Sequence, residues 1–394
     1  MVNDEETKEI KVLKEMKDIG SIKELDIPKG IMDEDKKSGK KELVQQKLIS
    51  TTKGPEITDV LKFVSFGTPL RTAIEKIAHA GTGALMVVGN EDILKIIRGG
   101  FSLDCKFTSN RVAELSKMDG AIVLDSKMSR ILYSSALMVP DPDIKTSETG
   151  SRHQAAERTA KQTGQLAIAV SQRTGLKTIY YGNVKYQLKE LENLLSRARS
   201  TLENMRKYRQ VVDELMTKLN FLEIMGFAEV YDITILLQRI EIIVRIEKEI
   251  RRHLIELGKE AGMLEIEFKE LIKDIEKEYM LIVRDYKKKV STKRIRKSLS
   301  NFSYDSLLDP SNIAVALGYS SLDEKVSPKG YRFLSKIKAL SPAKTEILIK
   351  KFNLKELFDM PIDAFVEQSG IEKKEAFEIL EEIKKLKNEL IAKL

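Results

Sequence analysis

The segment SETGSRHQAAERTAKQTGQLAIAVS (147–171) runs from a loop through one helix into one buried strand, and this succession decides the fold. Residues 152–163 contain neither Pro nor Gly, and Gly164 after them is a typical C-terminal helix cap. The apolar run at 165–171 has the length of a buried strand. A helix followed directly by a buried strand predicts a domain in which helices are layered on a sheet.

Neighbouring segments alternate between helix and strand in the same way. We expect helices at 69–80, which begins with Pro at an early helical position, and at 109–117. Short apolar runs predict further strands at 84–89, 121–125, 130–139 and 176–182. The sequence therefore predicts a multidomain α+β chain whose N-terminal α/β domain has a central mixed sheet.

The rest of the chain changes character from about residue 187 onward. Long amphipathic stretches such as 194–219 and 233–257 predict packed helices that form a spine. Ser, Asp and Pro then punctuate a connector, and short helices follow it. The predicted divisions are a charged, flexible extension at 1–53, the α/β domain at 54–186, the helical spine at 187–290, the connector at 291–330 and a helical C-terminal domain at 331–394.

Composition limits the compartment and the class of protein. A chain of 394 residues is long enough for two or three domains, and 6% aromatic residues without Trp favour a helix-rich chain. The single cysteine, Cys105, cannot form an internal disulfide, and we expect it to be inert in a reducing compartment. Because the sequence has neither a long apolar run nor a signal-peptide pattern, we expect a soluble cytoplasmic protein without a membrane partner.

Positive charge is concentrated in one part of the chain. Residues 284–351 contain 16 Lys and Arg but 6 Asp and Glu, a local charge of +10 within a total of +8. We call this segment the basic block. A focused basic segment indicates binding to a phosphate backbone, and the alternative is a solvated helix surface.

Asp119 is the first candidate for chemistry. It lies in LSKMDGAIVLD (115–125), where Asp-Gly separates an expected helix from an expected strand. As a turn, Asp bonds nearby backbone and Gly accepts a positive φ. As a functional group, the carboxylate at a strand edge facing a cleft can hold a divalent metal.

The start of the expected helix after Gly150 is the second candidate. Its first residues include Arg152 and His153, and a helix N-terminus attracts anions through its free N–H groups. Arg and His add charge-assisted donors that suit phosphate oxygens. The alternative is a plain cap, with Ser151 as N-cap and Gln154 completing a capping box, and both interpretations can hold together.

The third candidate lies near the C-terminus. Residues 367–380 predict a helix, a break at Gly370-Ile371 and a second helix, with Ala376 where the helices would cross. Such a hairpin can present backbone N–H groups to a DNA phosphate. Residues 338–352 look like a second, weaker copy, and the alternative is two ordinary helical turns.

Several motifs together resemble a known family. The order and spacing of five segments are similar to those of the diadenylate cyclase domain, and the spine and hairpins after GYRFL (330–334) resemble the DNA integrity scanning family of bacteria. The five segments are RGGFSLD (98–104), LSKMDGAIVL (115–124), LMVPDP (137–142), TGSRHQAAERTAKQTG (149–164) and IAVSQR (168–173).

The resemblance implies an enzyme, a nucleotidyltransferase that condenses two ATP into cyclic di-AMP and releases two pyrophosphates. It also implies a tandem helix-hairpin-helix domain that binds branched or damaged DNA, and a homo-octamer in which two cyclase domains face each other. In this reading Asp119 binds Mg²⁺ or Mn²⁺, and Asp119, Arg152 and His153 are catalytic. The implied ATP contacts are Gly120, Ala121, Met138, Gly150, Ser151, Arg152, His153 and Ser171, and the implied DNA contacts are Gly370, Ile371, Lys373, Lys374 and Lys344.

Three departures from the family pattern keep alternatives open. Gln154 stands where the family has a second Arg, Ser151 replaces Thr, and Glu372 replaces the second Gly of the hairpin. The loss of a cation at Gln154 leaves open an oligomeric DNA-binding scaffold that binds nucleotide with weak or no turnover. The carboxylate of Glu372 leaves open a cyclase that does not bind DNA.

Overall fold

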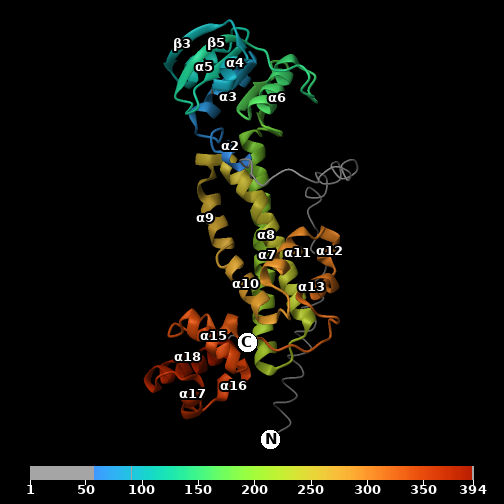
Figure 1. Cartoon of the computed structure of the whole chain (residues 1–394), viewed down its shortest axis with the longest axis vertical. Coiled ribbons are helices and arrows are strands. Elements are labelled where there is room, and N and C mark those ends of the chain that lie inside the picture. Colours follow the sequence, from blue (N-terminus) through green and yellow to red (C-terminus); the bar gives the residue numbers. More distant parts are fainter. Residues whose placement is uncertain (1–56, 90, 393–394) are drawn as a thin grey trace. The chain divides into compact units, whose positions relative to one another are not determined.

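A computed structural model describes residues 57–89 and 91–392, and the extension expected at 1–53 lies outside them. A mixed sheet with helices comes first, and long helices and a group of short helices follow (Figure 1). This confirms the expected α/β domain and the helical spine. None of the helices in the described part is both long and apolar enough to cross a lipid bilayer.

The sheet has eight strands, in the order β2-β5-β4-β1-β6-β7-β8 with β3 paired to β5. Only β1 and β4 are parallel among the described pairs, and all the others are antiparallel, so the expected mixed sheet is confirmed. The strands are β1 (Ala84–Val88), β2 (Ile97–Arg98), β3 (Phe101–Lys106), β4 (Ala121–Leu124), β5 (Arg130–Met138), β6 (Leu166–Val170), β7 (Lys177–Tyr181) and β8 (Val184–Gln187).

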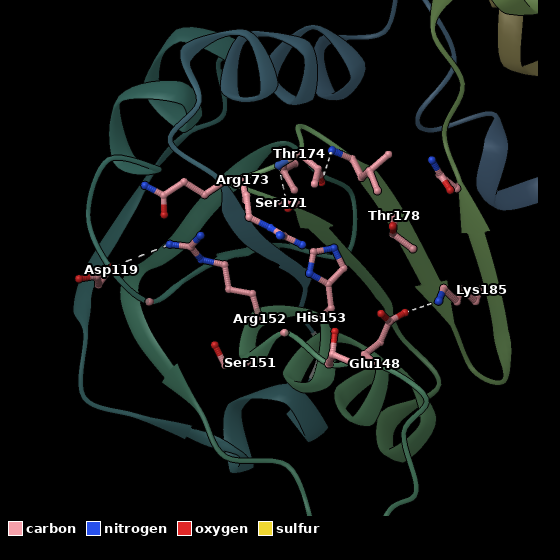
Figure 2. Close-up of a pocket in the computed structure, with 17 residues that line it drawn as sticks. Asp119, Glu148, Ser151, Arg152, His153, Ser171, Arg173, Thr174, Thr178 and Lys185 are labelled. Carbon is pink, nitrogen blue, oxygen red and sulfur yellow. Dashed lines mark hydrogen bonds and ion pairs between the residues drawn. The ribbon is translucent and has the colours of Figure 1, made fainter.

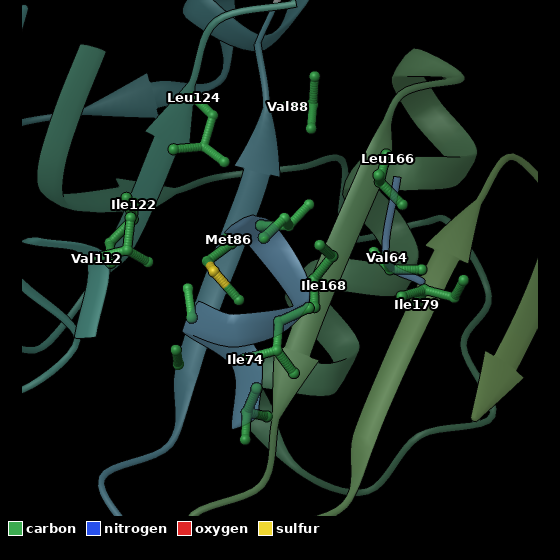
Figure 3. Close-up of a cluster of buried hydrophobic side chains, with 14 of the residues drawn as sticks. Val64, Ile74, Met86, Val88, Val112, Ile122, Leu124, Leu166, Ile168 and Ile179 are labelled. Carbon is green, nitrogen blue, oxygen red and sulfur yellow. The ribbon is translucent and has the colours of Figure 1, made fainter. Parts of the chain in front are cut away.

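Helices cover both faces of the sheet. Met86 and Ile122 point to the face covered by α3 (Pro69–Ala80) and α5 (Ser109–Leu115), where Ile74 and Val112 meet them (Figure 3). Alternate strand residues pack on the opposite face with Ala156 and Ala160 of α6 (Ser151–Thr163) and Ile93 of α4 (Glu91–Lys95). Because the central strands are buried on both sides, they read as continuous apolar runs.

Three strands were absent from the sequence prediction. β2, β3 and β8 lie at or near the sheet edges and are largely exposed, so they carry no apolar run. The pairing of β5 with its neighbours is also irregular, and Ser135 within it has a φ of 50°. Edge strands that need no buried face leave little signal in a sequence.

The spine consists of α7 (Leu191–Met225) and α8 (Val230–Leu257), which pack along each other, with α9 (Gly262–Leu271) and α10 (Ile275–Tyr286) beside them (Figure 1). A 3₁₀ turn at Gly258–Ala261, α2 (Ile57–Leu61) and three short helices complete this part. The short helices are α11 (Thr292–Asn301), α12 (Tyr304–Leu308) and α13 (Pro310–Leu317), of which α13 packs on α8.

The segment expected as a connector is therefore rich in helix. Its Ser and Asp punctuation marks helix starts: Ser291, Ser303 and Asp309 are N-caps, and Pro310 is the first residue of α13. These residues accept hydrogen bonds from the otherwise free N–H groups of a first turn. The same residue types mark both loops and helix starts, which explains the difference.

The C-terminal helices have a core of their own. They are α14 (Tyr331–Leu334), α15 (Pro342–Lys351), α16 (Leu354–Asp359), α17 (Ile362–Ser369) and α18 (Lys373–Ala392). Ala376 is fully buried, as expected where two helices cross closely. Gly370 ends α17 with a φ of 73°, a left-handed conformation that favours glycine. The predicted hairpin of helices at 367–380 is confirmed as a local structure.

A buried carboxylate joins the sheet domain to α8, and we call this contact the Glu256 junction. Glu256 accepts hydrogen bonds from the Lys189 backbone N–H at 2.8 Å and the Tyr186 hydroxyl at 2.7 Å. The guanidinium of Arg71 on α3 lies 3.5 Å from the same carboxylate, and both side chains are almost completely buried. Arg71 also donates to the Lys189 carbonyl. Two elements of the sheet domain are thus tied to the end of α8.

His253, one turn before the Glu256 junction, makes stability depend on pH. Burial, followed by the positive charges of Lys189, Arg197 and Arg252, lowers the pKa of His253 to about 4. An unfolded histidine takes up its proton near pH 6.5, so stability falls as the pH drops from about 6.5 to about 4, by about 3 kcal/mol in total.

Replacing His253 by Gln is expected to remove this part of the acid sensitivity. Denaturant unfolding at pH 7.5 and pH 4.5 measures the difference for each protein. His79→Gln is the control because His79 is exposed. An equal loss of stability with pH in wild type and His253→Gln would show that another group is responsible.

Candidate active site

A pocket of about 730 Å³ opens at one end of the sheet. Its walls come from the turn at Asp119, the start of α6, the turn between β6 and β7, and the facing strands β7 and β8 (Figure 2). The pocket therefore gathers segments that lie far apart in the sequence, including two of the motifs predicted to carry chemistry.

Asp119 and Gly120 form the first wall. Gly120 has a φ of 100°, and a Cβ there would lie 2.6 Å from the carbonyl carbon of Ser135 on β5. Only glycine fits this close approach of two backbones. The Asp119 side chain is fully exposed to solvent, so the turn places a carboxylate at the pocket mouth without satisfying it internally.

The start of α6 forms the second wall. Gly150 is the N-cap and makes no side-chain cap hydrogen bond, and Ser151 is the first residue of the helix. The capping box expected from Ser151 and Gln154 is therefore wrong. The Gln154 side chain donates to the Glu148 carbonyl at 2.8 Å instead. The backbone N–H of Gln154 closes the first turn by donating to the Gly150 carbonyl at 2.9 Å. Free N–H groups at this helix start remain available to an anion.

Arg152 links the two walls. Its Nη2 lies 3.8 Å from the Asp119 carboxylate oxygen Oδ1, a loose ion pair (Figure 2). A Cβ on Gly83, in the loop between α3 and β1, would lie 2.5 Å from Nη1 of Arg152. Gly83 thus leaves the space in which the guanidinium lies, and the sequence prediction did not give it this role.

His153 lies beside a second carboxylate. Its ring meets Tyr180 edge to face at 6.4 Å, and the Tyr180 hydroxyl donates to Glu148 at 2.8 Å. Lys185 of β8 pairs with the same carboxylate (Figure 2). Burial alone would raise the pKa of Glu148, but hydrogen bonds from Lys185 and Tyr180 outweigh burial and lower it. Burial lowers the pKa of His153, with Glu148 opposing, so a neutral imidazole is favoured at neutral pH.

Ser171 forms the third wall, in a tight turn between β6 and β7. Its backbone N–H donates to the Leu176 carbonyl at 2.8 Å, and its hydroxyl accepts from the Thr174 N–H at 3.3 Å. Arg173 in the same turn is exposed and lines the pocket. The turn therefore presents hydroxyl groups and a cation to whatever occupies the pocket.

Most of the predicted site residues come together here. Asp119, Gly120, Gly150, Ser151, Arg152, His153 and Ser171 all line the pocket. Ala121 and Met138 do not, because both side chains are buried in the core on the α4–α6 face of the sheet. Lining residues that the sequence reasoning gave no role are Glu148, Thr149, Val170, Gln172, Arg173, Thr174, Leu176, Thr178, Lys185 and Gln187.

The pocket suits a divalent cation that arrives with phosphates. The described residues contain no group of three His, Cys, Asp or Glu side chains placed to hold a metal by themselves. Mg²⁺ commonly binds through one or two carboxylates, with substrate phosphates and water as the other ligands. The exposed carboxylate of Asp119, facing an anion-binding helix start, fits that kind of site.

The residues predicted to contact DNA lie around the α17–α18 hairpin. Ile371 is buried, whereas Lys374 is exposed. Lys373 pairs with Asp363 at 3.0 Å in an exposed ion pair, and Lys344 of α15 pairs with Glu375 of α18. Because exposed ion pairs contribute little energy, Lys373 can exchange its carboxylate for a phosphate, whereas the Lys344–Glu375 pair is half-buried.

Ion pairs neutralise a good part of the basic block, and several of their acids lie outside it. Arg332 and its partner Glu223 are both almost completely buried, and Glu241, which is fully buried, lies 2.7 Å from Arg296. Further pairs among the described residues are Arg284–Glu346, Lys288–Glu324, Arg296–Glu276 and Lys344–Glu375. A local charge of +10 in the sequence therefore overstates the positive field at the surface.

Comparison with known proteins gives matches to two family models. Residues 71–184 match the model described as DisA bacterial checkpoint controller nucleotide-binding, and residues 188–326 match the DisA bacterial checkpoint controller linker region. The first range contains strands β1 to β7 and most of the pocket, and it ends where β8 begins. The second contains α7 to α13.

Curated relatives match over nearly their whole length. The DNA integrity scanning protein DisA of Carboxydothermus hydrogenoformans is 41% identical over 346 residues, which cover 86% of this chain and 98% of the relative. The protein of the same name from Clostridium botulinum strain Loch Maree is 36% identical, with coverages of 86% and 98%. That of Clostridioides difficile is 38% identical over 318 residues, with coverages of 79% and 89%.

Proposed function

The chain belongs to the family of the DNA integrity scanning protein DisA, and from this premise we propose that it is a diadenylate cyclase coupled to the scanning of DNA integrity. It condenses two ATP into cyclic di-AMP and releases two pyrophosphates. The observation that carries this proposal is the pocket itself, in which Asp119 faces the cationic start of α6 across a space of about 730 Å³. That space is sufficient for one nucleotide.

The residues of the pocket suit phosphoryl transfer, which depends on positioning and on neutralising charge. The N–H groups at the start of α6, together with Arg152 and His153, hold the triphosphate. Ser171 and Arg173 bind from the opposite wall. Mg²⁺ or Mn²⁺ on Asp119 would offset the negative charge that develops at the α-phosphate. Glu148 keeps Lys185 and Tyr180 in place beside His153.

One pocket binds only one of the two ATP molecules that the reaction needs. The 3′-hydroxyl of one ATP attacks the α-phosphate of a second, so the second ATP must be presented by another copy of the chain. The full exposure of Asp119 and the open pocket mouth support such an arrangement. We therefore propose that two cyclase domains face each other in a homo-oligomer, with an octamer as the expected assembly.

The C-terminal hairpins supply the proposed link to DNA. The left-handed Gly370 brings the backbone of the α17–α18 turn to the surface, and Lys344, Lys373 and Lys374 lie around it. Such contacts bind phosphates without reading a sequence, which suits branched or damaged DNA. We expect the protein to act in the cytoplasm, where both ATP and chromosomal DNA occur in bacteria.

Incubation of the purified protein with ATP and Mn²⁺ or Mg²⁺ tests the proposed reaction directly. The expected result is cyclic di-AMP, identified by chromatography and mass, with two pyrophosphates per product. An oligomeric protein that binds ATP but gives no product with either metal would contradict the proposal. That outcome would favour the nucleotide-binding scaffold that Gln154 left open.

Replacing Gly83 by Ala tests the position of Arg152. The new methyl group would displace the guanidinium, because its Cβ would lie 2.5 Å from Nη1. It would also lie 3.0 Å from the Cβ and the backbone N of Gln172, in the pocket turn that contains Ser171. We expect kcat/KM for ATP to fall about 10-fold or more, since small misplacements of a positioning group reduce rates strongly. Steady-state kinetics measures the effect.

Gly81→Ala is the matched control. Gly81 has a φ of 66° against 69° for Gly83, so both substitutions strain the backbone equally, but a Cβ on Gly81 meets nothing within 4 Å. Equal kinetic losses in the two variants would assign the effect to backbone strain and not to Arg152.

A further inference from the structure

A second pocket, of about 660 Å³, lies far along the chain from the first. It is formed by the end of α10, the segment after it, the end of α13 and the segment before α14, and four of its lining residues are lysines. The lysines are Lys287, Lys288, Lys289 and Lys329, and we call the site the lysine pocket. Neither the cyclase motifs nor the hairpins account for it.

Three of the four lysines are held in the pocket wall by different contacts, and Lys289 is exposed. Lys288 lies on the ring of Tyr319 at 4.3 Å and pairs with Glu324 at 2.7 Å, so its charge is largely balanced. Lys329 donates to the Lys287 carbonyl, and Lys287 donates to the Val290 carbonyl at 3.3 Å. Carbonyl oxygens fix an ammonium group in place without neutralising its charge.

The one carboxylate that lines the lysine pocket already accepts hydrogen bonds from the backbone. Asp285 is 2% exposed and accepts hydrogen bonds from the backbone N–H groups of Gly330 at 2.9 Å and Tyr331 at 2.6 Å. It also accepts from the Arg332 N–H at 3.1 Å. The carboxylate thereby caps the start of α14, and its oxygens are engaged by three backbone N–H groups.

The positive charges in the lysine pocket repel one another. Partial burial of its ammonium and then the charge of Lys287 lower the pKa of Lys329, and Asp285 opposes this only in part. An anion that binds beside such a group stabilises its protonated, positively charged form. The pocket therefore has more positive charge than its own acids neutralise.

We propose that the lysine pocket binds phosphate groups of the DNA backbone, as a second contact in addition to the hairpins. Lysines act as point charges that attract phosphates without demanding one orientation, which suits a backbone of variable geometry. The chain continues from Lys329 directly into α14 and the helices that carry the hairpins. The inference rests on the proposed DNA binding, and free polyphosphate is the other source of the same chemistry.

The double variant Lys289→Gln, Lys329→Gln tests this contact. Each lost lysine–phosphate contact reduces the salt dependence of log K by about 0.9, so the double variant should have a slope smaller by about 2. DNA affinity near 0.1 M salt should fall on the order of 10-fold or more. Fluorescence anisotropy with labelled duplex and junction DNA over a salt series measures both quantities on the full chain.

The control is the double variant Lys207→Gln, Lys248→Gln, which removes two exposed lysines of α7 and α8. It should bind DNA as the wild type does. Synthesis of cyclic di-AMP without DNA should be the same in all three proteins. If the lysine-pocket variant keeps the affinity and salt slope of a wild type that binds DNA, the DNA contact is overturned.

Isothermal titration with tripolyphosphate separates the two sources of phosphate, and it decides the matter if the wild type binds no DNA. The expected result is two sites per chain in the wild type, of which the lysine-pocket variant loses one and Arg152→Gln loses the other. Loss of the lysine-pocket site without any effect on DNA would assign the pocket to free polyphosphate. A single site, unaffected by the lysine substitutions, would overturn the phosphate site itself.

Discussion

Replacement of Asp119 by Asn is expected to abolish the synthesis of cyclic di-AMP, with a loss of about 1,000-fold or more. The amide keeps the shape of the side chain but loses the charge that would hold the divalent cation at the α-phosphate. Neutralising charge at a reacting phosphoryl group contributes several kcal/mol to a transition state, and about 4 kcal/mol corresponds to 1,000-fold. Product formation under saturating ATP measures the loss.

The same variant should fold and bind ATP nearly as the wild type does. The Asp119 side chain is fully exposed, and its ion pair with Arg152 spans 3.8 Å, so little structure depends on it. Asp143→Asn is a suitable control because Asp143 is exposed and does not line the pocket. If Asp119→Asn retains a tenth of the wild-type rate, Asp119 has no essential role in the reaction.

Among the substitutions proposed here, replacement of Glu256 by Ala is expected to reduce the free energy of unfolding most. It leaves the buried guanidinium of Arg71 without that carboxylate, and the Tyr186 hydroxyl and Lys189 N–H lose their acceptor. Removing one partner of a buried ion pair costs about 3–5 kcal/mol. In a domain of the size of the sheet domain, thermal unfolding should shift down by about 10 °C or more.

Glu260→Ala, which removes an exposed carboxylate four residues later, provides the comparison. Its unfolding temperature should stay within about 2 °C of the wild type, as for most surface substitutions. Calorimetry on both proteins measures the difference. A shift for Glu256→Ala no larger than that for Glu260→Ala would mean that Glu75 alone satisfies the charge of Arg71, with which it also pairs.

The sequence was sufficient to predict the helices and strands whose apolar residues follow a clear pattern. Strands such as β1 and β6 are buried on both faces and so form apolar runs, and α7 and α8 carry an apolar stripe over many turns. β3 escaped prediction because it is exposed along most of its length. The Ser and Asp residues before α12 and α13 were ambiguous because caps and loops use the same side chains.

The site was predictable where its residues follow one another in the chain. Asp119 and the run from Gly150 to His153 stand in compact motifs, and the structure brings them to one pocket. Gly83, Glu148 and Lys185 could not be found in this way. Their roles arise from contacts between separate elements: a Cβ that would meet Arg152, and a carboxylate that holds a lysine of another strand.

The ion pairs of the basic block also join parts of the chain that lie before and after residue 290. Glu223 and Glu241 on α7 and α8 are buried, and their cations, Arg332 and Arg296, come from residues beyond 290. A truncation near that position would take the arginine partners away from both buried carboxylates and leave Glu241 with Arg245 at 3.6 Å and Glu223 with the Tyr286 hydroxyl. The helices before and after residue 290 are therefore electrostatically interdependent, and we expect either part to lose stability when it is expressed without the other.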